Sequence, residues 1–495
     1  MKILFLAAEA SPLAKVGGLG DVAGSLPRAL AELGHEVRVV MPFSGLVDRA
    51  RFAPTPVARV AVPHVGGDQM ARIAEVRQGG VVFNLVAGPP IPRAKRVYGD
   101  DIHEDGPKFI FFSLAALGLC RALDWAPDVV HANDSHTGPA VYWLGTDGLH
   151  DSLFQASATV FTTHNLVYMN TGAAPYLREY GLAPSDSPVL PDWARDSLMG
   201  LGLAHADMLS AVSPGYAREI LTPEFGYGLE GVLSARRERL VGILNGLDLA
   251  EWDPSHDRQI AARFDAGSLE RRPRNKRALQ RALGLPAEAR TPLLGIVSRL
   301  DTQKGFDLAE PALRQLLSGA DPVQVAVLGT GLLAIEAAFK ALARDFPDSV
   351  VFEGRFDALR ARQIYAGADM LLIPSRYEPC GLAQMIAQRY GAVPVVRRTG
   401  GLADTVIDAA RPRRGTGFMF ADYNSAALLR ALRRALRLYR KPAGWQALQR
   451  RGMRLAESFS WARSARAYVA LYEQAIHYRK EAVERLAQAA PELAG

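Results

Sequence analysis

The sequence predicts an α/β protein with two doubly wound, Rossmann-like domains, and three observations support this fold class. Short apolar runs alternate with longer segments of helical periodicity in both halves of the chain, a pattern typical of parallel sheets with crossover helices. A polar, arginine-rich stretch broken by Pro254, Pro273 and Pro286 separates the halves. Glycines and charged residues follow several apolar runs, at the sheet edge where ligands bind in such folds.

The expected strands are the short apolar runs rich in β-branched residues. In the first half they comprise residues 3–7, 37–41, 81–86, 129–131, 159–162, 208–212 and 240–244, and in the second half residues 293–298, 323–328, 350–353, 370–373 and 393–396. The pattern predicts an N-terminal domain at residues 1–250, a linker region at 251–290 and a C-terminal domain at 291–460. A helical pattern at residues 461–495 lies too far past the last strand to be its crossover, and we expect it to return to the first domain.

Composition indicates a folded protein of a reducing compartment. The 495 residues suffice for roughly two to four domains of about 150 residues each. The opening apolar run stops at Glu9, too early for a signal peptide, and no apolar stretch reaches the roughly 18 residues that span a bilayer. Cys120 and Cys380 are too few for a disulfide framework and lack the spacing of a zinc site. We expect a cytoplasmic protein without membrane partners.

The net charge of +7 comes largely from arginine clusters at residues 271–277, 411–414 and 430–434. Such clusters could attract polyanions. In the last cluster, however, Leu428, Leu432 and Leu436 recur at helical spacing, so the arginines are interpreted as the solvent face of an amphipathic helix. No recognised nucleic-acid motif accompanies the charge, and we expect no nucleic-acid partner.

Charged side chains at strand ends carry the main functional hypothesis. Glu378 lies in a turn bounded by proline and glycine directly after an apolar strand. Arg299 and Lys304 follow another strand, and Lys15 lies between the first strand and a glycine pair. Cations beside glycine amides suit a diphosphate, and a carboxylate at the same kind of edge is a candidate site residue. These positions predict an enzyme acting on a sugar nucleotide.

Two glycine-rich turns are candidate anion cradles. Gly17 and Gly18 permit close backbone approach before a helix whose N-terminus carries partial positive charge, and Gly400 and Gly401 offer a second run of amides. The first turn lacks the spacing of a dinucleotide fingerprint or a P-loop, so an ordinary strand-to-helix turn remains an alternative. For Arg299, a solvent-exposed ion pair is the alternative.

Histidines cluster after two strands of the first half, in the segments 131–136 and 162–165. A metal site is not expected, because no convergent set of imidazoles, thiolates or carboxylates has a recognisable spacing. Contacts with sugar hydroxyls fit these residues better. A Ser-His-Asp hydrolase is also not expected, since a GxSxG elbow is missing.

In this order, the motifs closely resemble the bacterial and plant type of glycogen and starch synthase, a retaining glucosyltransferase family that uses ADP-glucose. The resemblance spans nearly the whole chain and rests on the segments 15–19, 163–166, 212–220, 228–231, 242–246, 298–305, 374–376, 378–382, 397–406 and 459–461. It implies the GT-B type of glycosyltransferase fold, with an active site in the cleft between the domains. The implied reaction transfers glucose from ADP-glucose to the non-reducing end of an α-1,4-glucan, glycogen or maltooligosaccharide, with retention and release of ADP. The resemblance implies no cofactor and no metal, and a monomer or small homo-oligomer.

Matching motifs also imply site residues. Glu378 takes the role of the essential acid near the transferred sugar, and Asp134, His164 and Asn245 lie near the glucose and the acceptor. The implied donor-binding residues are Lys15, Gly17, Gly18, Arg299, Lys304, Phe356, Cys380, Gly381, Leu382, Gly400, Gly401 and Thr405. Among them, Arg299 and Lys304 hold the diphosphate and Phe356 stacks on the base.

Some positions depart from the family pattern. The aromatic residue usual after Asp134 is Ser135, the customary Asp-Asn pair is Asp105-Gly106, Met199 replaces a common lysine, and Leu332 replaces a usual aspartate. These changes leave open a related transferase with another nucleotide sugar or a small acceptor. A catalytically silent glycan-binding protein is a further alternative. A phosphorylase is disfavoured because no segment indicates a lysine-bound pyridoxal phosphate.

Overall fold

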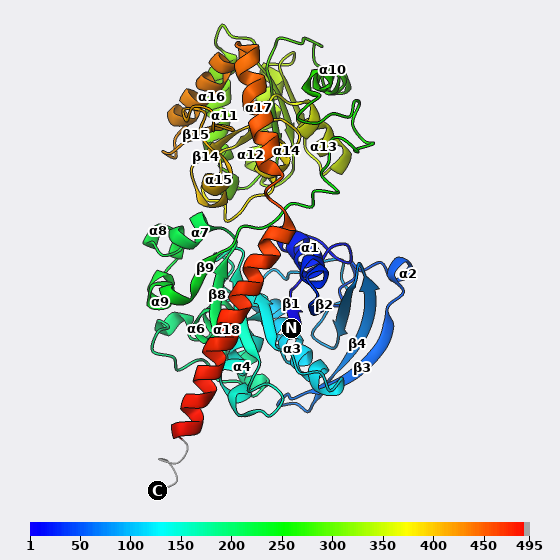
Figure 1. Ribbon diagram of the computed structural model, residues 1–495, viewed down its shortest axis with the longest axis vertical. Helices are drawn as coiled ribbons and strands as arrows, with labels where there is room; N and C mark the ends of the chain where they lie inside the picture. The colour runs from blue at the N-terminus through cyan, green and yellow to red at the C-terminus, as the bar shows by residue number, and fades with distance from the viewer. Residues whose placement is uncertain (490–495) are drawn as a thin grey trace. The chain divides into compact units, whose positions relative to one another are not determined.

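The computed structural model describes residues 1–489, which form two compact units (Figure 1). Unit 1 comprises Met1–Gly246 together with the segment that starts at Trp461, and unit 2 comprises Leu247–Ser460. Each unit has its own sheet, mainly parallel in unit 1 and parallel in unit 2, with helices on both faces.

The sheet of unit 1 has nine strands in the order β3-β4-β5-β2-β1-β6-β7-β8-β9 within the described residues. Their bounds are β1 (Lys2–Leu6), β2 (Glu36–Pro42), β3 (Thr55–Val62), β4 (Gln69–Gln78), β5 (Val81–Ala87), β6 (Val129–Asn133), β7 (Ala158–Thr163), β8 (Met208–Ala211) and β9 (Leu240–Gly242). All pairs are parallel except those of β4, which is antiparallel to both neighbours. The chain adds β2 on one side of β1 and later β6 on the other, so the winding reverses at β1.

Strands β3 and β4 were not among the expected strands. Both alternate buried and exposed residues along much of their length, because they form a hairpin extension at the sheet edge with one face in solvent. The expected strands were selected as continuous apolar runs, which are typical of strands buried on both faces. A hairpin with one face in solvent has no such run and was therefore missed. The short strand β15 (Phe418–Phe420) of unit 2 was missed as well.

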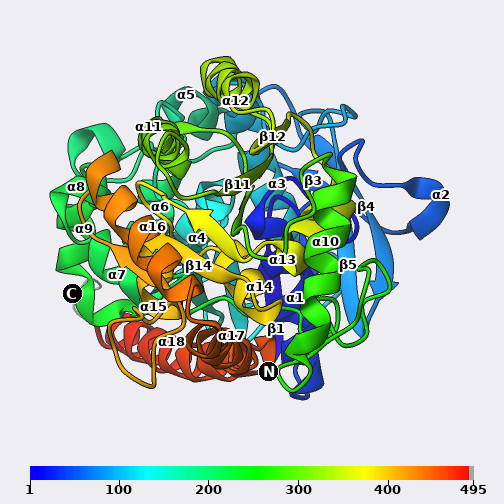
Figure 2. The same cartoon turned by 90° about the horizontal axis from the view of Figure 1, so that it is seen from above.

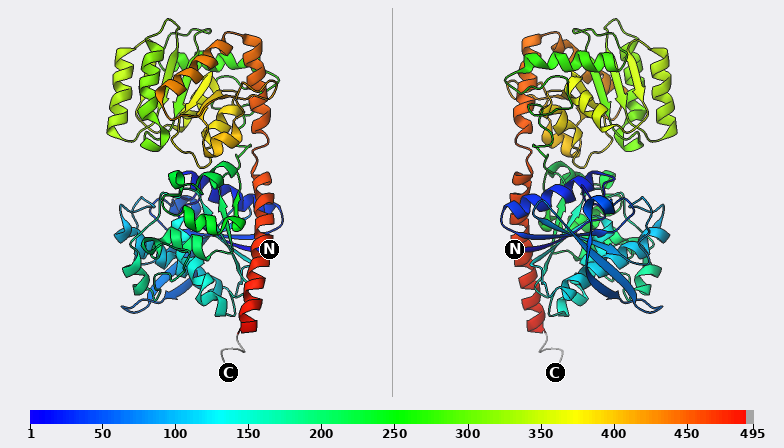
Figure 3. Two further views of the ribbon diagram at one scale, coloured as in Figure 1. Left: turned by 90° about the vertical axis from the view of Figure 1, so that its left-hand side faces the viewer. Right: turned by 90° about the vertical axis from the view of Figure 1, so that its right-hand side faces the viewer.

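Helices cover both faces of the unit 1 sheet, as two side views show (Figure 3). The helices are α1 (Gly18–Glu32), α2 (Arg49–Phe52), α3 (Ile102–Ala122), α4 (Gly138–Gly145), α5 (Ala174–Glu179), α6 (Leu198–His205), α7 (Pro214–Glu219), α8 (Pro223–Gly226), α9 (Glu230–Ala235) and α18 (Trp461–Ala489), with 3-10 turns at Ser135–Thr137, Asp147–His150, Asp192–Ala194 and Arg237–Arg239. Helices α1 and α18 pack together on one face, and α3 and α4 pack together on the other.

The long helix α18, red in Figure 1, is an integral part of unit 1. Its Tyr472 hydroxyl lies 2.8 Å from His131 Nδ1, and burial lowers the pKa of His131 to about 3. Arg479 is fully buried and pairs with Asp207, with 3.0 Å between Arg479 Nε and Asp207 Oδ2. Helix α18 therefore fills the core of a unit whose other elements lie more than 200 residues earlier. None of the described helices combines the length and apolar character needed to cross a membrane.

The described part of unit 2 contains a six-stranded, fully parallel sheet in the order β12-β11-β10-β13-β14-β15. The other strands are β10 (Leu293–Val297), β11 (Gln324–Leu328), β12 (Val350–Glu353), β13 (Met370–Ile373) and β14 (Val393–Arg397), and the helices are α10 (Arg272–Ala282), α11 (Phe306–Leu317), α12 (Leu333–Asp345), α13 (Ala358–Gly367), α14 (Ala383–Arg389), α15 (Gly400–Thr405), α16 (Ser425–Tyr439) and α17 (Pro442–Ala456), with 3-10 turns at Leu269–Arg271 and Thr302–Lys304. Helices α11 and α16 pack together on one side of the strands and α10 and α13 on the other (Figure 2). The winding reverses between β10 and β13.

Residues 251–290, expected as a linker region, are part of unit 2. The ammonium of Lys276 lies 2.6 Å from Asp369 Oδ2, and the Arg272 guanidinium donates to the carbonyl oxygens of Tyr390 and Ala368. Burial lowers the pKa of Arg272 to about 10. Two cations of the first arginine cluster thus anchor α10 to the unit, which explains why this polar segment is ordered.

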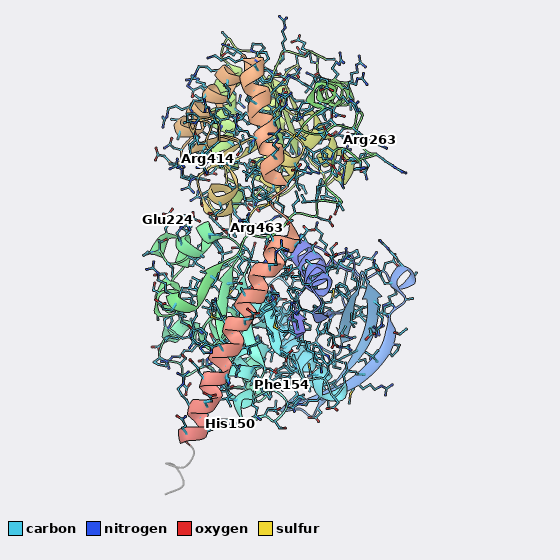
Figure 4. The ribbon with its side chains drawn as sticks, viewed as in Figure 1. His150, Phe154, Glu224, Arg263, Arg414 and Arg463 are labelled. Carbon is cyan, nitrogen blue, oxygen red and sulfur yellow. The ribbon has the colours of Figure 1, made fainter. Side chains whose placement is uncertain are left out.

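The other arginine clusters lie on the surface of unit 2. Arg414 is exposed in its loop, as is Arg263 elsewhere in the unit (Figure 4). On α16, Arg430 and Arg433 are exposed whereas Leu428, Leu432 and Leu436 are buried. The amphipathic interpretation of this cluster is therefore confirmed.

The buried ion pair of Arg479 provides a test of how much α18 stabilises unit 1. We expect Arg479→Ala to lower the free energy of unfolding by about 3 kcal/mol, because it leaves the carboxylate of Asp207 buried without its cation. The exposed Arg485 on the same helix is the matched control, and Arg485→Ala should change the free energy by less than about 0.5 kcal/mol. Chemical denaturation measures both variants, and equal stabilities would contradict the expectation.

Candidate active site

Several of the candidate residues lie where the winding of each sheet reverses. In unit 1, the turn after β1 holds Lys15, Gly17 and Gly18, and the turn after β6 holds Asp134. At such a reversal the adjacent crossover helices go to opposite faces and leave a crevice at the carboxyl ends of the strands. In unit 2, the same relation holds for the turns after β10 and β13.

The first glycine turn is organised by a buried carboxylate that we did not predict. Glu9 is 1% exposed, and it accepts hydrogen bonds from the amides of Val16 and Gly17, the latter at 3.1 Å, and from the Tyr98 hydroxyl at 3.0 Å. The amides of Val16 and Gly17 therefore do not form the open anion cradle that the sequence suggested. The sequence did contain a signal for Glu9, because it is an acid that follows a buried strand. The same signal led us to select Glu378.

Lys15 and Gly18 remain accessible in this turn. The Lys15 ammonium lies 2.6 Å from Asp21 Oδ1, and its side chain is 49% exposed. A Cβ atom added to Gly18 would meet no described atom within 4 Å, so local packing does not require a glycine there. Close approach of a ligand to the backbone would account for it.

Asp134 and His164 are neighbours at the ends of β6 and β7. Asp134 adopts a left-handed backbone with φ of 58°, and its Oδ1 accepts from the amides of His164 at 2.7 Å and Asn165 at 3.3 Å. Burial raises the pKa of Asp134 to about 7 and lowers that of His164 to about 3. The imidazole is therefore neutral, and its Nε2 lies 2.9 Å from Asn133 Oδ1. Strained backbone of this kind clusters at functional sites, which keeps Asp134 among the candidate site residues.

Three buried polar atoms in the segments that follow β6, β7 and β9 are unsatisfied. Nδ1 of His136, Oδ1 of Asn165 and Oδ1 of Asn245 have no hydrogen-bond partner among the described residues. Buried polar atoms in folded proteins nearly always have partners. These three atoms are therefore exceptions to that rule.

In unit 2, the structure brings together two predicted residues. The Lys304 ammonium donates to both carboxylate oxygens of Glu378, with distances of 2.9 Å to Oε1 and 2.8 Å to Oε2. Ser375, which we did not single out, donates its hydroxyl to Glu378 Oε2 at 2.8 Å. Glu378 is 6% exposed. Its carboxylate is held by Lys304 and Ser375, which follow the adjacent strands β10 and β13.

Arg299 and Phe356 do not take part in this cluster. The Arg299 side chain is 63% exposed and pairs with Asp301, with 3.3 Å between the nearest atoms. Phe356 is 88% exposed in the loop between β12 and α13, where it is free to contact a ligand.

The segments around Cys380 and Gly401 pack against each other. A Cβ atom on Gly401 would lie 2.1 Å from the Cys380 carbonyl oxygen, and Gly381 has a positive φ of 73°, so both positions require glycine for backbone reasons. Cys380 is buried, Leu382 is half-buried before α14, and Gly400 begins α15 with φ of 41°.

Thr405 is not placed to contact phosphate directly. Its hydroxyl is fully buried, donates to the Gly401 carbonyl at 2.6 Å and accepts from Gln384 Nε2 at 3.0 Å. Gln384 also donates to the carbonyl oxygens of Cys380 and Gly381. Thr405 therefore holds the glycine turn and the loop after β13 together.

Among the described residues, no group of three or more His, Cys, Asp or Glu side chains is arranged to hold a metal ion. Glu9 and Asp134 in unit 1, and Glu378 with Lys304 in unit 2, have hydrogen-bond partners within their own unit. The chemical capacity of the site lies in cations, a buried carboxylate and neutral polar groups at strand ends.

Family models match both units. Starch synthase catalytic domain matches residues 2–235, and Glycosyl transferases group 1 matches residues 284–450. The chain is 46% identical to Glycogen synthase from Anaeromyxobacter dehalogenans, over 95% of this chain and 99% of that protein. It is 41% identical to Glycogen synthase from Moorella thermoacetica, over 98% of each chain.

Solved structures are similar over almost the entire length. The catalytic domain of Starch Synthase IV from Arabidopsis thaliana, bound to ADP and acarbose, has a TM-score of 0.88 and 31% identity, covering 96% of this chain and 99% of that chain. Sucrose-phosphate synthase from Thermosynechococcus elongatus has a TM-score of 0.61 at 21% identity, covering 96% of this chain and 98% of that chain, a similarity of fold alone.

The raised pKa of Asp134 predicts a pH-dependent stability. Between 3.8, its ordinary value, and about 7, the folded protein retains a proton that the unfolded chain releases. The free energy of unfolding should therefore fall as pH rises through this window, by about 4 kcal/mol from this group, and Asp134→Asn should remove that contribution.

Denaturant unfolding of wild type and variant at several pH values measures this effect. Asp124→Asn is the control, because Asp124 is exposed and asparagine tolerates its positive φ of 47°. A stability difference between Asp134→Asn and wild type that stays constant from pH 4 to pH 7 would rule out the raised pKa.

Proposed function

Because the chain belongs to the glycogen and starch synthase family of glycosyltransferases, we propose that it transfers glucose from ADP-glucose to the non-reducing end of an α-1,4-glucan, with retention of configuration. Its two parallel-sheet units have the GT-B glycosyltransferase fold. The family implies a nucleotide sugar and a glucan as the substrates, and ADP-glucose with glycogen or maltooligosaccharide is the specific pair that we propose.

The observation that carries the proposal is the contact of Lys304 with Glu378 at the winding reversal of unit 2. Glucosyl transfer breaks the bond between the anomeric carbon and the diphosphate oxygen, and the electron pair leaves with ADP. Positive charge develops on the sugar and negative charge on the leaving group. A cation and a carboxylate that are already oriented can stabilise these opposite charges without reorganisation.

In the proposed reaction, a glucan hydroxyl attacks the anomeric carbon on the face that the diphosphate leaves. Its proton passes to the departing phosphate oxygen, which balances the transfer and retains the configuration. Lys304 and Arg299 stabilise the diphosphate, and Glu378 lies near the anomeric centre. With these side chains supplying positive charge, the proposed mechanism requires no metal and no cofactor.

The remaining roles follow the family motifs. Lys15 and the backbone at Gly18 contact the donor, beside Gly17, whose amide Glu9 holds, and Phe356 stacks on the base. Asp134, His164 and Asn245 bind glucose and acceptor hydroxyls. We expect Gly400 and Gly401 near the phosphates, held by Thr405 and by the loop of Cys380, Gly381 and Leu382. An active site in the cleft between the domains, a cytoplasmic location and a monomeric or small oligomeric state stay predictions.

The departure at Gly106 has a local explanation. A Cβ atom at this position would lie 2.6 Å from Cδ2 of Tyr176, so packing against α5 requires a residue without one. Met199 is likewise fully buried, and its sulfur accepts a hydrogen bond from Thr163. These substitutions therefore give no specific support to a different sugar nucleotide or a small acceptor.

An ADP-release assay tests the proposed function. The purified protein is incubated with ADP-glucose or UDP-glucose, each with and without glycogen. We expect ADP release that requires glycogen, and label from the glucose moiety in the polymer. Release of UDP alone would indicate another donor, and glycogen binding without nucleotide release would indicate a catalytically silent protein.

Glu378→Gln tests the role of the carboxylate. We expect turnover to fall by about a hundredfold or more, because the charge opposite the developing cation is lost. ADP affinity, measured calorimetrically, should change far less, since Lys304 is retained. Glu310→Gln is the control, a glutamate in a partly exposed ion pair with Arg314 on α11. Normal turnover of Glu378→Gln would remove this residue from the mechanism.

A further inference from the structure

Glu9 and Tyr98 form a hydrogen-bonded pair behind the glycine turn of unit 1. We propose that this pair is a positioning device that fixes the turn at residues 15–18 and thereby sets the affinity for the nucleotide-sugar donor. The proposal rests on the proposed function for the identity of the donor, and it concerns residues that the family motifs quoted above do not include.

The geometry of Glu9 indicates a positioning role. Both oxygens of the buried carboxylate lie 3.1 Å from the Gly17 amide nitrogen, and Val16 and Tyr98 supply further donors. A carboxylate at 1% exposure is tolerated only when donors satisfy it. Because these donors come from the protein itself, Glu9 acts through the turn and does not contact the substrate.

Tyr98 is itself held on both sides. The amide of Gly99 donates to Asp105 Oδ1 at 2.7 Å, and the ammonium of Lys108 donates to the Val97 carbonyl at 2.8 Å. Asp105 and Lys108 form an ion pair and are both buried. This pair fixes the residues before and after Tyr98, and so the position of its hydroxyl.

The state of the Tyr98 hydroxyl agrees with this role. Burial raises the pKa of Tyr98 well above its usual range, and the neighbouring charge of Glu9 raises it further. The phenol is therefore protonated at neutral pH and available as a donor to the carboxylate. The pair is a neutral donor with an anionic acceptor, a stronger arrangement than two neutral groups.

The turn is consequently shaped before any ligand binds. Two of its amides are satisfied by Glu9, and Gly20 in the first turn of α1 approaches the same carboxylate so closely that a Cβ atom would lie 3.1 Å from Oε2. A preorganised turn avoids the cost of ordering Lys15 and Gly18 when the donor binds. Loosening Glu9 should therefore weaken donor binding without changing the chemical step.

The test compares Glu9→Gln and Tyr98→Phe with Arg96→Gln. Arg96 belongs to the same segment as Tyr98, but it forms exposed ion pairs with Asp100 and Glu104, so its variant is the matched control. We measure KM for ADP-glucose, KM for glycogen, kcat, and the calorimetric Kd of ADP. Tyr98→Phe keeps the carboxylate of Glu9 and the aromatic ring and removes only the hydroxyl that joins them. This variant therefore tests the role of the pair even if Glu9→Gln fails to fold.

We expect KM for ADP-glucose and Kd for ADP to rise about tenfold in Glu9→Gln, which removes the charge that three donors face, and about threefold in Tyr98→Phe, which removes one of those hydrogen bonds. kcat and KM for glycogen should stay close to the wild-type values, as should all constants of Arg96→Gln. Donor affinity in Tyr98→Phe equal to that of the control, or a fall in kcat at unchanged KM, would overturn the proposal.

Amide hydrogen exchange of the ligand-free protein separates this inference from the proposed function. Exchange in residues 15–20 should be faster in Glu9→Gln and Tyr98→Phe than in wild type or Arg96→Gln. Unchanged exchange would overturn the positioning role even in an active enzyme. If wild type shows no ADP release with glycogen, the proposed function fails, while the exchange result still tests the link between Glu9 and the turn.

Discussion

The reversal of winding in each parallel sheet is the constraint on which the candidate site depends. At β1 and again between β10 and β13, successive crossovers go to opposite faces and leave the carboxyl ends of two strands uncovered by helices. The residues that follow those strands are therefore brought together although they are distant in sequence. Lys304 and Glu378 are 74 positions apart and share two hydrogen bonds for this reason.

The two units use buried carboxylates differently. Glu378 is satisfied by side chains, an ammonium and a hydroxyl, which a ligand can partly replace. Glu9 is satisfied mainly by backbone amides, which fixes a turn. Asp134 also accepts backbone amides, and burial still raises its pKa to about 7. A buried carboxylate thus has a different role in each place. Glu378 is the candidate catalytic acid, Glu9 holds a backbone turn, and Asp134 is a group whose pKa is raised by burial.

The sequence predicted the strands that are buried on both faces and the residues that follow them, because apolar runs and strand ends are local features. Lys304 and Glu378 were each selected in this way, but their direct contact depends on the strand order. Glu9 was interpreted only as the end of an apolar run, since nothing local shows that its carboxylate turns back toward Gly17. Thr405 was predicted among the donor-binding residues, but the partners of its hydroxyl, Gln384 on another helix and the Gly401 carbonyl, could not be foreseen. Such long-range partners could not be inferred from spacing alone.

The placement of α18 has a consequence for biosynthesis. Domains usually fold in the order in which they leave the ribosome. Here Tyr468, Tyr472 and Arg479 complete a core that is otherwise made by the first half of the polypeptide. A nascent chain therefore carries an unfinished N-terminal unit until α18 has been synthesised, whereas unit 2, continuous in sequence and complete before α18, can fold earlier. Holding that unfinished surface free of aggregation is a task for the cell during the synthesis of this protein.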